Sequence, residues 1–483
     1  MEVVMSTLSV PRPVKKRSLF VTSVAPTRSN IDRCGAILIV LVLVCWAAGF
    51  AIGFESAVAA LTAIGFATAV FGFRWPAVGL MGVGILCTLD SVTRVYMADA
   101  GGLLRWNTFN YWLLAATLLN FSVILKISGP HMLLLKLLIL LLGVEIAISP
   151  DRTEGIVNEL DILALFGLVI YFVRALRNPR SLLWLGMVCG FTAAAGIPSF
   201  YLHQSDLPYI NPNALAVFPL TAIFAICLAL GNVKLELRER VLLGGLAVVN
   251  FSWVFLSGSR GGLFTAAMGM LFILVTIGNI GARLLFMLVA ALTLAVILSS
   301  YTNLRVHTLG RIDRAFDTEL SAVERTSGRS DLALGGWYIF LDSPLGVGTG
   351  GFPTAWSNLG SRAGLSGFDR GDKMSAHSAW IKTLAENGLP GIILLIGFVL
   401  SFSFIGRRRE YEGGPGLWKL GILVTLCLGV AFLSTEFQAK GLWLLVAGAV
   451  GSFHRQERAI ISARRAGRSK SRLALVLSQG SSR

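Results

Sequence analysis

Long apolar runs are the feature that most constrains the fold of this chain. Of its 483 residues, 55% are hydrophobic and only 14% are charged, whereas soluble domains carry about 25% charged residues. Runs of about 17–25 apolar residues are long enough to cross a bilayer as helices. Lipid cannot satisfy backbone polar groups, so each run has to be a helix. We therefore expect an all-α, polytopic transmembrane helix bundle of about 12–14 spans.

The apolar runs follow one another closely along the first 300 residues. The joints between the first three runs are short, so fewer helices could account for that part. The basic stretch before the first run is too long for an ordinary signal peptide, and it predicts a retained first helix. The expected spans are 34–54, 56–73, 75–90, 109–127, 131–149, 160–175, 181–197, 213–231, 239–258, 261–280, 283–300, 390–406, 417–435 and 438–453.

One polar segment is far longer than the other joints. Loops of this length in a compact domain are usually functional, so we expect the chemistry there. The chain then divides into a basic tail at 1–33, an N-terminal transmembrane bundle at 34–300, a large loop at 301–389, C-terminal transmembrane helices at 390–453 and a basic tail at 454–483.

The distribution of Lys and Arg predicts the orientation. With the N-terminus in the cytoplasm, most of the 42 basic residues fall in cytoplasmic tails and loops, and short outer loops hold few, Lys440 among them. Both termini are then cytoplasmic, and 301–389 lies outside. The net charge of +16 can face anionic lipid, so we expect membrane lipids rather than nucleic acid as the partner. We expect the tail from Arg455 to Arg483 to be disordered or to lie on the membrane.

Several common chemistries find no support in the sequence. The six cysteines lie in or beside apolar runs without a C-x-x-C pair, which argues against a disulfide framework or a zinc site. There is no P-loop, H-E-x-x-H or G-x-S-x-G motif. ATP-driven transport and metal-dependent hydrolysis are therefore not indicated.

The large loop is partly helical by its pattern. A helix is expected at 328–342 with Ser327 as its N-cap, and its apolar residues have near-helical spacing. A glycine-rich turn follows at 343–352, and a second short helix at 376–388. On that second helix we expect His377 to share a face with Trp380, Ile381 and Leu384. Asn387, Gly388 and Pro390 should end this helix and begin the next span.

Four charged or titratable residues are candidates for the site, each with an ordinary alternative. Arg329 falls in the first turn of the expected helix, where the helix dipole disfavours a cation and a bound anion would reverse that effect. The alternative is that Arg329 pairs with a nearby acidic residue. Arg260 lies in a Gly-rich joint between spans and either binds a ligand or snorkels to the surface. His377 is either a base or a solvated residue. Glu145 either pairs with a buried cation or carries a charge at a helix end, which we favour.

The order and spacing of these residues resemble one family of bacterial membrane proteins. The matching pieces are the Ser259–Gly262 joint, the Gly328-Arg329 stretch with Trp337, the glycine turn and the stretch from His377 to Gly391. Asn211-Pro212-Asn213 is similar to an asparagine-bearing outer loop of that family. The chain thus resembles the O-antigen ligase and O-antigen polymerase superfamily over about 211–395.

The resemblance implies a glycosyltransferase in the bacterial inner membrane. Its donor is a glycan linked to undecaprenyl diphosphate, its acceptor is a saccharide or lipid A-core, and neither a metal nor another cofactor takes part. The catalytic roles carry over to Arg260, Arg329 and His377. Substrate-binding roles are expected for Ser259, Asn213, Trp337 and Glu386. The chain departs from the pattern of the family at two points. Ser378 stands where many relatives have asparagine, and the expected number of spans exceeds the number usual in the family.

Elementary chemistry agrees with these roles. Breaking the sugar C1–O bond puts negative charge on the departing diphosphate, which two fixed guanidinium groups would stabilise. The acceptor hydroxyl is a poor nucleophile, so a positioned base such as His377 helps its attack.

Three activities remain open. The general appearance of the chain favours polymerisation of exopolysaccharide or O-antigen repeat units, with other polysaccharide assembly proteins as partners. Ligation to lipid A-core is the alternative within the family. A polysaccharide flippase is the alternative of another class; it would show discontinuous helices in matching halves and charges in mid-span, which the sequence does not indicate.

Overall fold

The protein is helical throughout the part that is described. The computed structural model describes residues 28–96, 106–202, 212–232, 235–276, a few positions between 283 and 317, 329–359, 376–411, 417–432 and 440–480. No strand occurs in these residues. The all-α fold class is therefore confirmed.

The helices follow the expected spans closely. Every expected span except 283–300, which lies mostly outside the described residues, coincides with a helix, and 109–127 is divided between two. The helices are α1 (Arg28–Ile52), α2 (Phe54–Phe71), α3 (Pro76–Tyr96), α4 (Trp106–Leu119), α5 (Phe121–Lys126), α6 (Pro130–Glu145), α7 (Arg152–Ala175), α8 (Arg180–Leu202), α9 (Pro212–Asn232), α10 (Leu237–Leu256), α11 (Arg260–Thr276), α15 (Arg329–Asp342), α16 (Phe352–Asn358), α17 (Ala379–Tyr411), α18 (Leu417–Ala431) and α19 (Lys440–Gly480).

Several of these helices can cross a membrane. Within the described residues, 7 helices are long and apolar enough, and shorter apolar helices include Arg260–Thr276 and Leu417–Ala431. Helix α6, which is not one of these seven, illustrates how an apolar helix sits at the edge of the bundle. Its Leu135 and Leu138 are buried, whereas Leu133 and Leu140 are exposed. Exposed leucines of this kind fit contact with lipid tails, so the chain is a multi-pass membrane protein.

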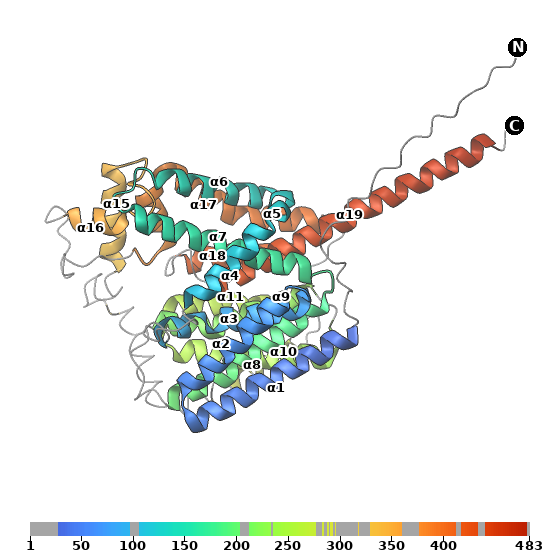
Figure 1. Cartoon of the computed structure of the whole chain (residues 1–483), viewed down its shortest axis with the longest axis horizontal. Helices are drawn as coiled ribbons and strands as arrows, with labels where there is room; N and C mark the ends of the chain where they lie inside the picture. Colours follow the sequence, from blue (N-terminus) through green and yellow to red (C-terminus); the bar gives the residue numbers. More distant parts are fainter. Residues whose placement is uncertain are drawn as a thin grey trace, which may run out of the picture.

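The helices pack side by side into one bundle with two different ends (Figure 1). Helices α15 and α16 lie at one end, which we call the loop end. Helices α1, α8 and α10 all begin at the opposite end, where Arg180 binds Asp32 at 3.1 Å and Glu239 at 2.9 Å. Since consecutive helices alternate in direction, α9 and α11 begin at the loop end.

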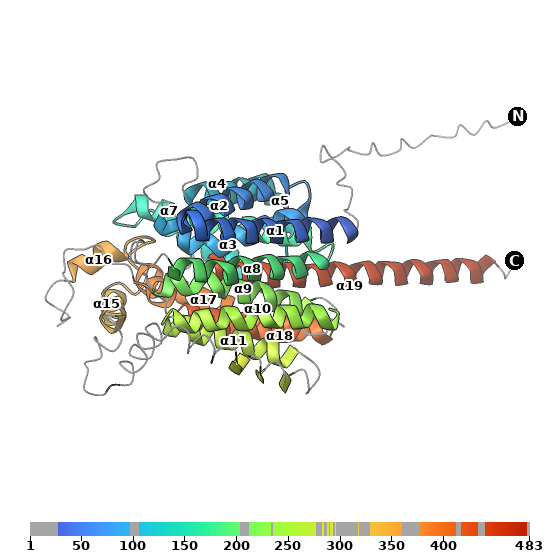
Figure 2. The same ribbon diagram turned by 90° about the horizontal axis from the view of Figure 1, so that it is seen from below.

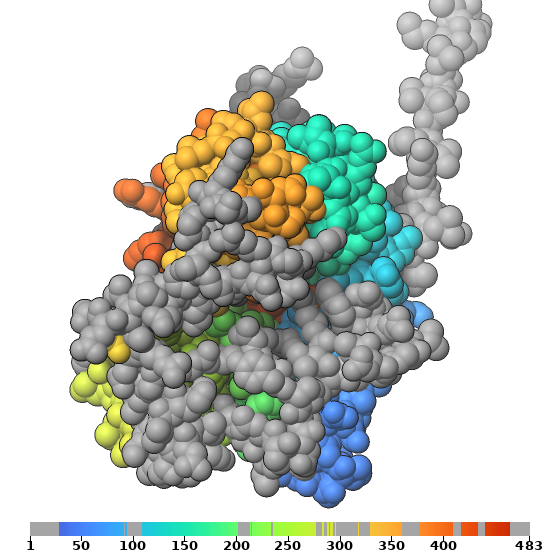
Figure 3. Space-filling model, turned by 90° about the vertical axis from the view of Figure 1, so that its left-hand side faces the viewer, coloured from blue at the N-terminus to red at the C-terminus, as the bar shows by residue number. Residues whose placement is uncertain are grey.

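The described part of the large loop forms a small folded unit. In this loop unit (residues 329–359), Leu332 and Ile339 of α15 pack against Phe352 and Trp356 of α16. The cluster also includes Ile381 of α17, so the loop unit rests on the first turns of that helix. Figure 3 views the loop end and shows α15 and α16 beside the start of α7. The expected apolar face of α15 is divided, because Leu334 and Trp337 are exposed.

The last helix is longer than the expected span 438–453. Helix α19 continues without a break from Lys440 to Gly480, beyond the bundle (Figure 2). We expected the tail to be disordered or to lie on the membrane. In the structure its residues up to Gly480 prolong the spanning helix instead.

A buried ion pair joins α3 to α19. Lys440 Nζ lies 2.5 Å from Asp90 Oδ1, and the side chains are only 2% and 6% exposed. Lys440 also lies over the ring of Phe109, 5.6 Å from its centroid. We expected Lys440 in a short outer loop; it is a buried residue at the first position of α19. The sequence shows a lysine near the start of the last expected span, but its partner is 350 residues away.

Replacing Lys440 by Met tests this pair. The change removes the buried cation that faces Asp90, and loss of one partner of a buried pair destabilises by about 3–5 kcal/mol. We expect Lys440→Met to lower the apparent unfolding temperature of the detergent-purified protein, measured by size-exclusion after heating. The double variant Asp90→Leu/Lys440→Met should recover most of the loss. An equally unstable double variant would contradict this account.

Candidate functional site

Ser259 fixes the start of α11 against the start of α9. Its Oγ donates a hydrogen bond to Asn213 Oδ1 (2.6 Å) and accepts one from the backbone N–H of Gly262 (3.0 Å). The second contact is an N-cap, which satisfies one of the free N–H groups of the first helical turn. The structure thus brings Ser259 and Asn213 together. Arg260, the first residue of α11, follows this anchor directly and is partly buried.

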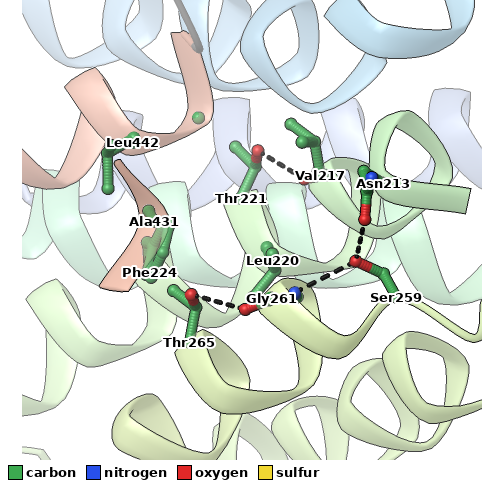
Figure 4. A pocket seen from close by; sticks show the side chains of 12 residues that line it. Asn213, Val217, Leu220, Thr221, Phe224, Ser259, Gly261, Thr265, Ala431 and Leu442 are labelled. Carbon is green, nitrogen blue, oxygen red and sulfur yellow. Dashed lines mark hydrogen bonds between the residues drawn. The ribbon is translucent and has the colours of Figure 1, made fainter. Parts of the chain in front are cut away.

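A pocket opens beside this anchor, between α9, α11, α18 and α19 (Figure 4). Its volume is about 420 Å³ when the open space at its mouth is included. We call it the α9–α11 pocket. Asn213 and Ser259 supply polar groups where the two helices begin, whereas Leu220 and Phe224 line the pocket about two and three turns further along α9. Small residues bring the helices close, since a Cβ on Gly441 would lie 2.1 Å from Thr221 Oγ1. The pocket therefore runs from a polar end to an apolar interior.

Arg329 begins the loop unit. It is the first residue of α15 and is partly buried, as expected for a residue of the first turn. Its proposed cap, Ser327, lies outside the described residues. Trp337, two turns further along, is 47% exposed and leans on Phe340 with ring centroids 5.4 Å apart. Trp337 is therefore available at the surface of the loop unit.

His377 occupies an unusual backbone position. Its φ of 49° is the one positive value at a non-glycine residue in the described chain, and its side chain is exposed. Such conformations are strained by about 1–3 kcal/mol and cluster at functional sites. The expectation that His377 shares a helical face with Trp380 is wrong, because α17 begins only at Ala379.

The residues after His377 are attached to the end of α18. Ser378 Oγ donates to the carbonyl oxygen of Phe432 (2.8 Å), and Trp380 Nε1 donates to that of Gly429 (3.1 Å). Ala431, between these two acceptors, lines the α9–α11 pocket. His377 is thus held one residue from an anchor beside that pocket.

The glycine-rich turn is inserted between two parts of the bundle. Val347 N donates to Ala385 O (3.1 Å) and Gly348 N to Glu386 O (2.9 Å), both on α17. On the other side, a Cβ on Gly348 would lie 2.6 Å from Ser149 Cα, between α6 and α7. The turn needs glycine because φ is +96° at Gly346, +94° at Gly348 and +83° at Gly350.

The same turn explains the break in α17. Gly388 has φ 58° and ψ −153°, so the helix is interrupted where Asn387, Gly388 and Pro390 predicted an end. Leu389 N then donates to Pro344 O (3.0 Å) of the turn. The predicted turn and the predicted helix end are both confirmed, and the hydrogen bond between Leu389 and Pro344 joins them.

Glu386 and Glu145 lie beside this turn. Glu386 is 2% exposed, and its Oε1 accepts a hydrogen bond from Phe352 N (3.2 Å) at the start of α16. Glu145 ends α6 and is buried, which fits its expected place at a helix end. Its carboxylate accepts a hydrogen bond from the side-chain amide of Asn387. In the structure both carboxylates hold the turn and the loop unit to the bundle.

Comparison with families of known proteins gives a match within the chain. Residues 245–396 match a protein family described as O-antigen ligase.

Residues 245–396 therefore form an O-antigen ligase domain, and this match supports the resemblance to the O-antigen ligase and polymerase superfamily.

The O-antigen ligase domain reaches from α10 into α17. It includes Arg260, Arg329 and His377, as well as Ser259, Trp337 and Glu386, whereas Asn213 precedes it. No curated protein matches the chain. The activity is thus of the O-antigen ligase or polymerase type.

The expected site residues are not all gathered in one pocket. Asn213 and Ser259 line the α9–α11 pocket, and Glu386 lines a second pocket between α6, α7 and α17. Neither of these two pockets is lined by Arg260, Arg329 or His377. These three residues instead lie at the loop end, each at or just before the start of a helix.

Sequence reasoning missed the residues that support the site. Thr349 donates to Leu142 O (2.9 Å) and accepts from the amide of Asn387 (3.1 Å), so it joins the turn to α6 and α17. The repeated glycines predicted the turn, but no neighbouring residue in the sequence predicted that the turn contacts α6, α7 and α17.

Gly348→Ala tests whether the turn holds the loop unit. The added Cβ would meet the backbone at Ser149 and would be strained at a φ of +94°. We expect the loop unit to become sensitive to limited proteolysis while the helix content by circular dichroism stays unchanged. Gly245→Ala is the control, since nothing lies within 4 Å of the added atom. An unchanged cleavage pattern in Gly348→Ala would contradict the assignment.

Proposed function

We propose that the protein transfers a glycan from undecaprenyl diphosphate to a sugar hydroxyl on the periplasmic face of the inner membrane. The observation that carries the proposal is the O-antigen ligase match, which contains Arg260, Arg329 and His377. Support also comes from the positions of these residues at the loop end of the bundle.

The two arginines would bind the diphosphate of the donor. Each is the first residue of its helix, where free backbone N–H groups and the helix dipole also favour an anion. The dipole disfavours a cation there, and a bound diphosphate reverses that effect. Guanidinium groups can bind phosphate oxygens with two parallel hydrogen bonds.

The polyprenyl part of the donor would enter the α9–α11 pocket. Its apolar side chains, Leu220, Phe224 and Leu442, suit an isoprenoid chain. The hydrogen-bonded pair of Ser259 and Asn213 lies at the end where the diphosphate would emerge. Arg260 follows Ser259 directly.

The reaction exchanges one C1–O bond for another. The acceptor oxygen forms a bond to C1 of the donor sugar while the bond from C1 to the diphosphate oxygen breaks. Undecaprenyl diphosphate leaves with the electron pair, and its added negative charge is stabilised by Arg260 and Arg329. His377 takes the proton of the acceptor hydroxyl. Trp337, exposed on α15, offers a face on which sugar rings can pack.

The acceptor that we propose is another lipid-linked repeat unit, so that the product is an exopolysaccharide or O antigen. Ligation to lipid A-core is the alternative that uses the same donor and the same residues. Neither the broken α17 nor the Asp90–Lys440 pair favours a flippase, because both have structural partners described above.

Alanine variants of the three residues test the proposal. Arg260→Ala and Arg329→Ala should each lower glycan assembly by about 10²–10³-fold, since a preorganised charge donor is lost. His377→Ala should lower it by about 10²–10⁴-fold. The measurement is surface glycan in a deletion strain that carries each variant.

Arg152→Ala is the matched control. Arg152 is an exposed arginine at the start of α7, at the same loop end. It should leave glycan assembly unchanged. Full complementation by all three site variants at normal protein level would rule out the enzyme.

Cysteine labelling tests the orientation. With the native cysteines replaced, Ser357→Cys in the loop unit should react with a membrane-impermeant maleimide added to spheroplasts. Arg408→Cys, at the opposite end of α17, should react only after the membrane is opened. Both side chains are exposed, so access to the reagent and not burial decides the result. Labelling of Arg408→Cys in intact spheroplasts would invert the orientation.

A further inference from the structure

The pocket between α6, α7 and α17 has the composition of a sugar-binding site. Its volume is about 460 Å³ when the open space at its mouth is included, and it lies at the loop end, beside the glycine-rich turn. Asn158 of α7 and Lys382, Thr383 and Asn387 of α17 give it polar walls. Its floor is apolar and includes Leu138 of α6.

Two polar atoms in this pocket are left for a ligand. Thr383 is 6% exposed, and no described residue forms a hydrogen bond with its hydroxyl. Asn387 is 1% exposed; its amide N–H groups bind Glu145 and Thr349, but no described residue donates to its carbonyl oxygen. Neither is among the fully buried side-chain atoms that lack a partner, so both atoms are accessible from the pocket. A sugar hydroxyl both donates and accepts, so it can satisfy both atoms.

The position of the pocket suits an acceptor. Ala379 lines it, and the preceding Ser378 is bonded to Phe432, next to Ala431 of the α9–α11 pocket. His377 therefore lies two residues before Ala379 of this pocket and one residue before the anchor beside the α9–α11 pocket. A base at that position is close along the chain to both pockets.

We infer that the pocket between α6, α7 and α17 binds the sugar end of an amphiphilic, phosphate-bearing acceptor glycolipid. The inference rests on the proposed function. Thr383 and Asn387 bind sugar hydroxyl groups, and the apolar floor with Leu138 and Leu142 accommodates the start of a lipid chain. Lys382 supplies a cation for a phosphate. Two glycolipids share this chemistry: a lipid-diphosphate-linked repeat unit and lipid A-core.

Native mass spectrometry of the full-length protein in detergent tests the inference. One probe is undecaprenyl diphosphate linked to N-acetylglucosamine, and the other is lipid A with its inner-core sugar. Thr383→Val and Asn158→Leu should weaken one binding event about tenfold, as expected for a lost hydrogen bond. Thr383→Ser should retain it. Leu389→Ala, an exposed position on the same helix, is the control.

Each outcome decides a point. Two bound lipid-linked molecules, one of them lost in Thr383→Val, assign the pocket to a lipid-linked acceptor. Loss of lipid A binding assigns it to lipid A-core. If neither probe binds wild type, or if Thr383→Val and Asn158→Leu bind both probes like wild type at the same elution volume, the inference is wrong. The proposed function fails separately, through full activity of the Arg260, Arg329 and His377 variants.

Discussion

The insertion of one glycine-rich turn between three helices is the contact on which the arrangement of the loop end depends. Gly346, Gly348 and Gly350 let the backbone approach α17 on one side and the α6–α7 joint on the other. Every side chain larger than hydrogen would separate these elements, since the spaces are filled by backbone atoms. The loop unit is thereby held to the bundle by main-chain contacts that leave little freedom of orientation.

Single hydrogen bonds from serine side chains fix the starts of two helices at the loop end of the bundle. Ser259 joins α11 to α9, and Ser378 joins the start of α17 to α18. A residue next to such an anchor is positioned by the backbone rather than by its own long side chain. This is how Arg260 and His377 acquire defined positions at the border between the bundle and the loop, as a preorganised site requires.

Much of the fold follows from the sequence because apolar length is a local property. The spans, the turn at 343–352 and the helix end at Gly388 could be predicted from neighbouring residues alone. The structure contains these features in the described residues. Contacts between distant residues were not predictable in this way. Asp90 with Lys440 and Asn387 with Glu145 each join parts of the chain more than 200 residues apart. The position of His377 outside its helix was missed for a local reason, since a positive φ at histidine is rare.

The Asp90–Lys440 pair has a consequence for how the protein enters the membrane. Asp90 is inserted with α3, but its lysine arrives only with the last helix. The lysine that faces Asp90 in the folded bundle is therefore missing until the final helix is in place. A chain that stops before α19 cannot form this buried ion pair, so the contact between α3 and α19 is completed only at the end of synthesis.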